Sequence, residues 1–196
     1  KPTTLHHDIT VMNDRVKRAS RQGNIIVVGH SYGGLVVTEM LKENKSYIDG
    51  IVLIEPTTAV HRVRFKALNT ERVNLDDQLI AKYMPPHLRP HYKILTDELD
   101  GAKPELQPLP ADLPTILFTS TKVHSEPLFF EETAVGKSLW LQLHNELFQN
   151  VRKGQHIRSD EWGHTVHSEA PDAVAKAIIN LVDILSDESE QNISKG

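Results

Sequence analysis

Short apolar runs alternate with helical patterns along the first part of the chain. Residues 24–28 and 51–54 are rich in β-branched side chains and almost continuously apolar, which is typical of strands buried on both faces of a sheet. Residues 35–44 between them have helical character, and residues 8–20 before them repeat their apolar positions at helical spacing. Two such strands joined by a helix predict a βαβ unit and therefore a parallel sheet.

The segment 57–113 departs from this pattern, because it carries six prolines, several charges and no long apolar strand. We expect one or two short helices there, in a lid or excursion outside the sheet. Strand character returns at 115–119 and, more weakly, at 155–157, with a helix over 129–151 between them.

A last helix is expected to start at Pro171, where apolar residues form one stripe. The pattern thus predicts an α/β core made of residues 1–56 and 114–186. The lid would comprise residues 57–113, and residues 187–196 would form a polar tail.

Composition narrows the function classes. The 196 residues are 39% hydrophobic and 24% charged, which suits one globular domain with a buried core. The formal net charge of −4 offers no basic field for a nucleic acid, and no apolar run is long enough to predict a membrane span. The chain has no cysteine, which excludes thiol nucleophiles and Cys-based zinc sites, and the compartment stays open.

Candidate chemistry begins at Gly29-His30-Ser31-Tyr32-Gly33, which lies directly between a predicted strand and a predicted helix. A serine on such a sharp turn projects its hydroxyl above the sheet, and the flanking glycines let neighbouring backbone approach. The amide of Tyr32 opens the following helix and could donate to a developing oxyanion. Ser31 is therefore the candidate nucleophile, and an inert serine in a glycine-rich turn is the alternative.

Residues 25–41 resemble the fifth strand, elbow and following helix of the α/β-hydrolase superfamily, in its serine-nucleophile branch of esterases and lipases. Residues 49–56 and 113–119 resemble the sixth and seventh strands, and residues 162–171 resemble the closing segment, where a Gly-His pair precedes the last helix. The chain thus resembles the C-terminal part of such a protein, and the implied fold is a parallel sheet flanked by helices.

The resemblance implies that His164 is the catalytic base, since it lies between the last strand and the last helix. His167 is the second choice. His30, within the elbow, is expected to support the turn, and His144 is expected on a helix surface. The histidines show no convincing zinc spacing, so no metal and no other cofactor is expected.

The acid that should orient His164 is harder to assign. The family usually places it just after the seventh strand, but that slot falls near Val123 in this chain. Some members place the acid after the sixth strand, where Glu55 stands, so Glu55 is our choice. Glu126 is the alternative.

About four strands and a loop with a second oxyanion donor precede the elbow in the family, whereas about 23 residues precede the first strand here. We therefore expect an N-terminal segment or a second chain to complete the sheet.

The expected function is a serine esterase-type hydrolase that cleaves an ester, lactone or thioester of a small acyl substrate through an acyl-enzyme. A lyase or acyltransferase with the same triad, and a non-catalytic ligand-binding protein of this fold, remain alternatives.

Overall fold

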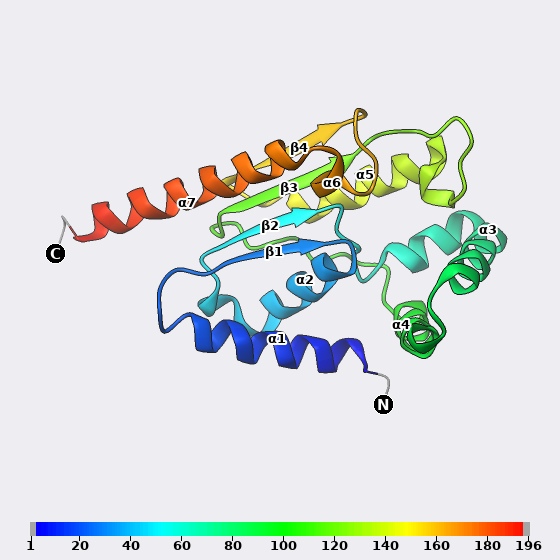
Figure 1. The fold of residues 1–196 in the computed structure, drawn as a ribbon, viewed down its shortest axis with the longest axis horizontal. Helices are drawn as coiled ribbons and strands as arrows, with labels where there is room; N and C mark the ends of the chain where they lie inside the picture. Colours follow the sequence, from blue (N-terminus) through cyan, green and yellow to red (C-terminus); the bar gives the residue numbers. More distant parts are fainter. Residues whose placement is uncertain (1–2, 194–196) are drawn as a thin grey trace.

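The computed structural model describes residues 3–193, and it contains one parallel four-stranded sheet (Figure 1). The strands are β1 (Ile26–His30), β2 (Gly50–Ile54), β3 (Thr115–Ser120) and β4 (Gly154–Ser159), and they lie side by side in this order. All three pairings are parallel. The fold class predicted from the apolar runs is therefore confirmed, because all four strands fall where strand character was expected.

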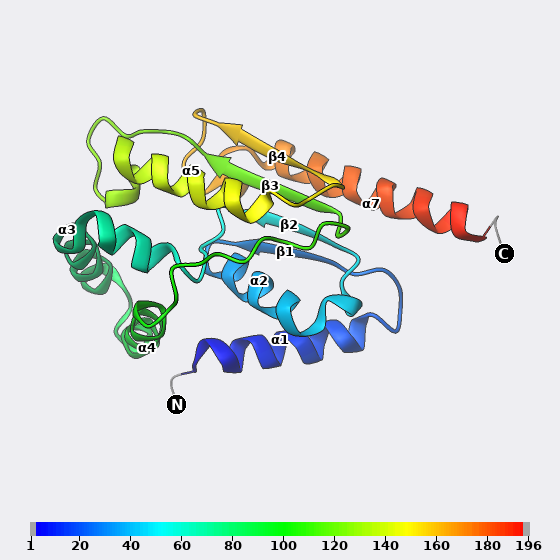
Figure 2. The ribbon, with the colours of Figure 1, turned by 180° about the vertical axis from the view of Figure 1, so that it is seen from behind.

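Helices cover both faces of this sheet, as Figures 1 and 2 show from opposite sides. One face packs against α1 (Leu5–Ala19), α2 (Tyr32–Asn44) and α5 (Ala134–Phe148), and its core includes Met40, Leu53 and Leu147. The other face packs against α6 (Val166–Glu169) and α7 (Pro171–Ile193). The fully apolar strand β2 separates the two cores, since its side chains alternate between them.

The segment between β2 and β3 leaves the sheet and forms two helices, α3 (His61–Tyr83) and α4 (Arg89–Asp100), with the 3₁₀ turn η2 (Pro86–Leu88) between them. Both helices lie beyond the carboxyl ends of the strands (Figure 1). The range of α3 spans 23 residues, but Asn69 has non-helical backbone angles and divides it into two shorter helical segments. The excursion therefore stands over the edge of the sheet where a parallel sheet carries its site.

Two 3₁₀ turns complete the set of elements, and two helices differ in length from the prediction. The 3₁₀ turns η1 (Lys45–Tyr47) and η3 (Phe130–Glu132) follow α2 and precede α5. Helix α5 is shorter than the helix expected over 129–151, because η3 occupies its predicted start. Helix α7 extends to Ile193, into the segment that we expected as a polar tail. None of the helices in the described range is long and apolar enough to span a bilayer.

Candidate active site

Ser31 occupies the turn between β1 and α2. Its φ of 51° lies in the left-handed region that side chains other than glycine rarely adopt. The turn is fixed by its own backbone: the Ser31 N–H donates to the carbonyl of Ile54 at 3.1 Å, and the Ser31 carbonyl accepts from the N–H groups of Thr57 at 3.0 Å and Gly34 at 2.9 Å. These bonds tie the turn to the end of β2, so the serine is held by two adjacent strands.

The glycines around Ser31 allow this close packing. A Cβ on Gly29 would lie 2.8 Å from the carbonyl oxygen of Gly33, and a Cβ on Gly34 would overlap the side chain of Pro56. A Cβ on Gly33 would meet nothing within 4 Å. Two of the three glycines are therefore required by space, since the strand, the helix and the segment after β2 converge there.

Glu55 follows β2 as Ser31 follows β1, and it too has a positive φ, of 47°. Its side chain is fully buried. The Oε1 atom accepts hydrogen bonds from the N–H of Ser120 at 2.6 Å and from the Nε1–H of Trp140 at 3.1 Å. Its other oxygen, Oε2, is left to face the site.

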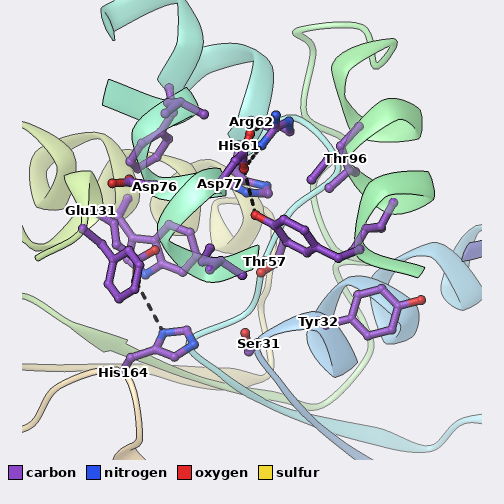
Figure 3. A pocket seen from close by; sticks show the side chains of 18 residues that line it. Ser31, Tyr32, Thr57, His61, Arg62, Asp76, Asp77, Thr96, Glu131 and His164 are labelled. Carbon is purple, nitrogen blue, oxygen red and sulfur yellow. Dashed lines mark hydrogen bonds and ion pairs between the residues drawn. The ribbon is translucent and has the colours of Figure 1, made fainter. Parts of the chain in front are cut away.

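His164 lies in the loop between β4 and α6, and its Nδ1 atom is 3.4 Å from Oε2 of Glu55. A second carboxylate, that of Glu131 in η3, lies 4.0 Å from the same nitrogen (Figure 3). The backbone carbonyl of His164 accepts a hydrogen bond from Nε2 of His30 at 2.9 Å. The loop is thus anchored to β1, and the imidazole stands between two carboxylates and the cavity.

Ser31 and His164 face the same cavity, as Figure 3 shows. No hydrogen bond joins the Ser31 hydroxyl to His164 in the part of the chain that is described. In unliganded enzymes such bonds are often long and tighten when substrate binds.

Glu55 and His164 shift each other's pKa in the directions that favour an ion pair. Burial opposes ionisation of Glu55, but the adjacent His164 and the Lys137 ammonium hold the pKa of Glu55 below its usual range. Burial also opposes protonation of His164, yet the carboxylates of Glu55 and Glu131 raise the pKa of His164 above its usual value. The site therefore favours an ionised glutamate that stabilises a protonated imidazole.

A buried network lies beside Glu55. His144 of α5 donates from Nε2 to the carbonyl of Pro56 at 2.9 Å, so its Nδ1 accepts from the hydroxyl of Thr119 at 2.7 Å. That hydroxyl oxygen in turn accepts from Nε2 of His156 at 2.7 Å. Burial lowers the pKa of His144 to about 4. The expectation that His144 lies on a helix surface is therefore wrong, because it is fully buried.

The cavity above Ser31 has a volume of about 350 Å³. Its roof comes from α3 and α4, and most of its wall is apolar or aromatic, including Phe65, Ile80, Leu99 and Trp140. Arg62 of α3 ties the two roof helices together, since it donates to Asp100 of α4 at 2.8 Å, and it also donates to Asp77 within α3 at 2.6 Å. The cavity can hold a small organic molecule, with Ser31 and His164 on its floor.

The structure brings most of the sequence candidates together. Ser31, Tyr32 and His164 line one cavity, and Glu55 lies behind His164. Tyr32 opens α2, where the first N–H groups have no partner within a helix. Its side chain turns to α1, where the hydroxyl donates to Asp8 at 2.7 Å.

The other candidates lie apart from this cluster. His167 contacts the ring of His30 and does not line the cavity. Glu126 is exposed, and the ion pairs of His164 within residues 3–193 involve Glu55 and Glu131 instead. Sequence reasoning missed Glu131, which carries no motif, and it missed Lys137, whose Nζ lies 3.6 Å from Oε2 of Glu55.

A hydroxyl on a tight turn, an imidazole facing the same cavity and a buried carboxylate behind it can together perform nucleophilic acyl chemistry. The comparisons with solved structures agree on the fold. The chain is similar to the Mycobacterium tuberculosis protein BpoC, with a TM-score of 0.57 and 16% identity over 94% of this chain and 76% of that one. MenH from S. aureus gives a TM-score of 0.52 and 16% identity over 93% of this chain and 76% of its own.

An esterase from Pyrococcus furiosus gives a TM-score of 0.54 and 15% identity, over 89% of this chain and 61% of that one. No curated protein sequence matches the chain. The family model described as serine aminopeptidase S33 (Hydrolase_4) matches residues 2–112, more than half of the chain. The chain therefore belongs to this family of α/β-hydrolases.

Proposed function

We propose that the protein is a serine hydrolase that cleaves a carboxylic ester-type bond, in an ester, a lactone or a thioester, through an acyl-enzyme. Ser31 would be the nucleophile, His164 the general base and Glu55 the acid that orients it. One observation carries this assignment: the three residues follow three of the four parallel strands at the same edge of the sheet, with Glu55 3.4 Å from His164.

In acylation, Oγ of Ser31 attacks the carbonyl carbon while Nε2 of His164 takes the hydroxyl proton. The bond to the leaving alcohol or thiol then breaks, and the imidazolium returns the proton to the leaving group. A water molecule then attacks the acyl carbonyl while Nε2 of His164 takes its proton. The bond to Oγ of Ser31 breaks, the proton returns to that oxygen, and the carboxylic acid is released. The N–H of Tyr32 would donate to the oxyanion, since Tyr32 follows the nucleophile and opens α2. Removal of one such donor lowers kcat by roughly 100- to 1,000-fold.

The excursion that contains α3 and α4 would act as the lid and set substrate size. A cavity of about 350 Å³ with largely apolar walls suits a small neutral acyl group. The bond between Arg62 of α3 and Asp100 of α4 would hold both roof helices together and keep the cavity covered. Water would be excluded from the acyl group in this arrangement.

The edge of the sheet at β1 has no neighbouring strand among the described residues. Strand β1 lies at one edge of the sheet, and Val28 in its centre is 46% exposed. An adjoining strand from a preceding segment or a second chain would cover this edge and supply the second oxyanion donor.

A fluorophosphonate probe tests the mechanism directly, because it modifies only a serine that a neighbouring base activates. Intact mass of the protein should increase by one adduct, and the Ser31→Ala variant should gain none. His164→Gln should also remain unmodified, while Ser125→Ala, in an exposed loop, should react as the parent does. An unmodified parent that still binds small esters, measured by a shift in melting temperature, would favour a binding protein instead. Product analysis separates hydrolysis from lyase or acyltransferase chemistry.

A further inference from the structure

Lys137 is a buried lysine beside the candidate triad. It lies in the first turn of α5 and is only 5% exposed. Its Nζ atom is 3.6 Å from Oε2 of Glu55, the only carboxylate within 4 Å of it among the described residues. A lysine is almost never buried without a partner, because desolvation of an ammonium is unfavourable. Glu55 is therefore the partner that stabilises the buried ammonium group, and Lys137 can in turn act on the site through Glu55.

The local packing directs Lys137 to this place. The N–H of Lys137 donates to the carbonyl of Thr133 at 2.8 Å, which fixes the first turn of α5. A Cβ on the preceding Gly136 would lie 2.7 Å from the Cα of Glu131, so α5 begins in direct contact with η3. One close approach thus places Glu131 beside His164 and Lys137 beside Glu55.

We propose that Lys137 is a positioning residue for the reaction: its ammonium group shares Oε2 of Glu55 with His164 and limits how strongly that carboxylate holds the protonated imidazole. This inference rests on the proposed function. Oε1 is already bound by Ser120 and Trp140, so Oε2 is the atom for which the lysine and the histidine compete.

The charges around His164 explain why an opposing cation matters. Glu55 after β2 and Glu131 in η3 both favour the protonated imidazole, which is inactive as a base. Lys137 of α5 opposes them. The other titratable groups in this cluster are the imidazoles of His30 on β1, His144 on α5 and His167 on α6. Among the described residues around His164, Lys137 is therefore the lysine that counteracts the two glutamates.

The pH profile of kcat/KM tests the role in the intact protein, with a p-nitrophenyl ester as the substrate. In Lys137→Met the imidazole should hold its proton to higher pH, so the acidic limb should move upward by roughly one pH unit. Lys103→Met, which removes an exposed lysine, is the matched control and should keep the parental limb. A uniform loss of activity without a shift, or a downward shift, would overturn the proposal.

A chemical rescue separates the charge from the packing. The chain has no cysteine, so Lys137→Cys can be alkylated with 2-bromoethylamine at that position alone. In the aminoethylated protein the acidic limb of the kcat/KM profile should return to its parental pH, whereas unmodified Lys137→Cys should keep the shifted limb. Failure of the restored ammonium to move the limb back would contradict the role.

The titration of His164 by NMR gives a readout that needs no turnover. In the Ser31→Ala background, with the signal assigned through His164→Gln, Lys137→Met should raise the pH midpoint of His164. An unchanged midpoint would overturn the inference even if the protein is an active hydrolase. A raised midpoint in a protein that does not hydrolyse esters would refute only the proposed function. If Lys137→Met does not fold, Lys137→Gln takes its place in both experiments.

Discussion

Replacement of Glu55 by glutamine separates the charge of this side chain from its shape. The amide oxygen can still accept from the N–H groups of Ser120 and Trp140. The amide nitrogen would then replace Oε2, so that a donor faces both Nδ1 of His164 and the ammonium of Lys137. His164 loses its acceptor, and with it the tautomer that leaves Nε2 free to take the serine proton.

The size of the effect follows from the geometry. Two unit charges 3.4 Å apart attract each other by about 5 kcal/mol at an effective dielectric constant of about 20. Loss of this stabilisation for the imidazolium in the transition state corresponds to roughly a 1,000- to 10,000-fold decrease in kcat. The corresponding pair with Glu131 is longer, at 4.0 Å, and the Glu131 side chain is 30% exposed, so solvent screens the attraction and we expect a smaller decrease in Glu131→Gln than in Glu55→Gln.

The assay is kcat for hydrolysis of a p-nitrophenyl ester in Glu55→Gln, Glu131→Gln and Glu126→Gln. Thermal unfolding must accompany it, because the lost carboxylate leaves Lys137 buried without a counter-charge, which can destabilise a protein by about 3–5 kcal/mol. The reasoning fails if folded Glu55→Gln keeps activity within about tenfold of the parent. A large loss in Glu126→Gln would place the acid after β3 instead.

Two further predictions concern stability. Gly34→Ala should destabilise the protein by about 1–3 kcal/mol because the new methyl group overlaps Pro56. Gly33→Ala should be neutral or slightly stabilising, because its methyl group meets no other atom within 4 Å. Equal melting temperatures for the two variants would refute this prediction. Acidification from pH 7.5 to 5 should lower the free energy of unfolding by about 2 kcal/mol through His144, whose folded pKa of about 4 lies below its unfolded value. The loss of stability begins below about pH 6.5 and levels off below about pH 4. In urea titrations, the free energy of unfolding of His144→Gln should depend less on pH than that of the parent. His156, whose pKa is also lowered, should account for part of the pH dependence that remains.

Much of the fold could be predicted from the sequence because its signals are local. The β-branched runs of β1 and β2 predict strands without any knowledge of the rest of the fold, and the glycines around Ser31 indicate a tight turn. Ser31 and His164 could be selected from their places between strand and helix. Their catalytic roles stay predictions, as does that of Glu55, although its place beside His164 agrees with the choice.

The rest depends on how helices pack. Lys137 and Glu131 reach the site because α5 begins against η3, and no pattern along the chain specifies that contact. The burial of His144 had a usable signal, because Trp140 and Leu147 stand four before and three after it and are both buried. The packing of the helices in the excursion also has no signal along the chain, because Arg62 of α3 pairs with Asp77 beyond the break in the same helix and with Asp100 of α4.

The left-handed backbone at Ser31 sets the proposed catalytic role of this residue against the stability of the fold. A non-glycine residue held there is less favourable by roughly 1–2 kcal/mol, an energetic frustration that the surrounding turn must absorb. Glycine at this position would relieve it and abolish the hydroxyl in the same step. If Ser31 is the nucleophile as proposed, a lineage released from selection for catalysis would gain stability as it lost the hydroxyl, and the descendant would keep its cavity for ligand binding.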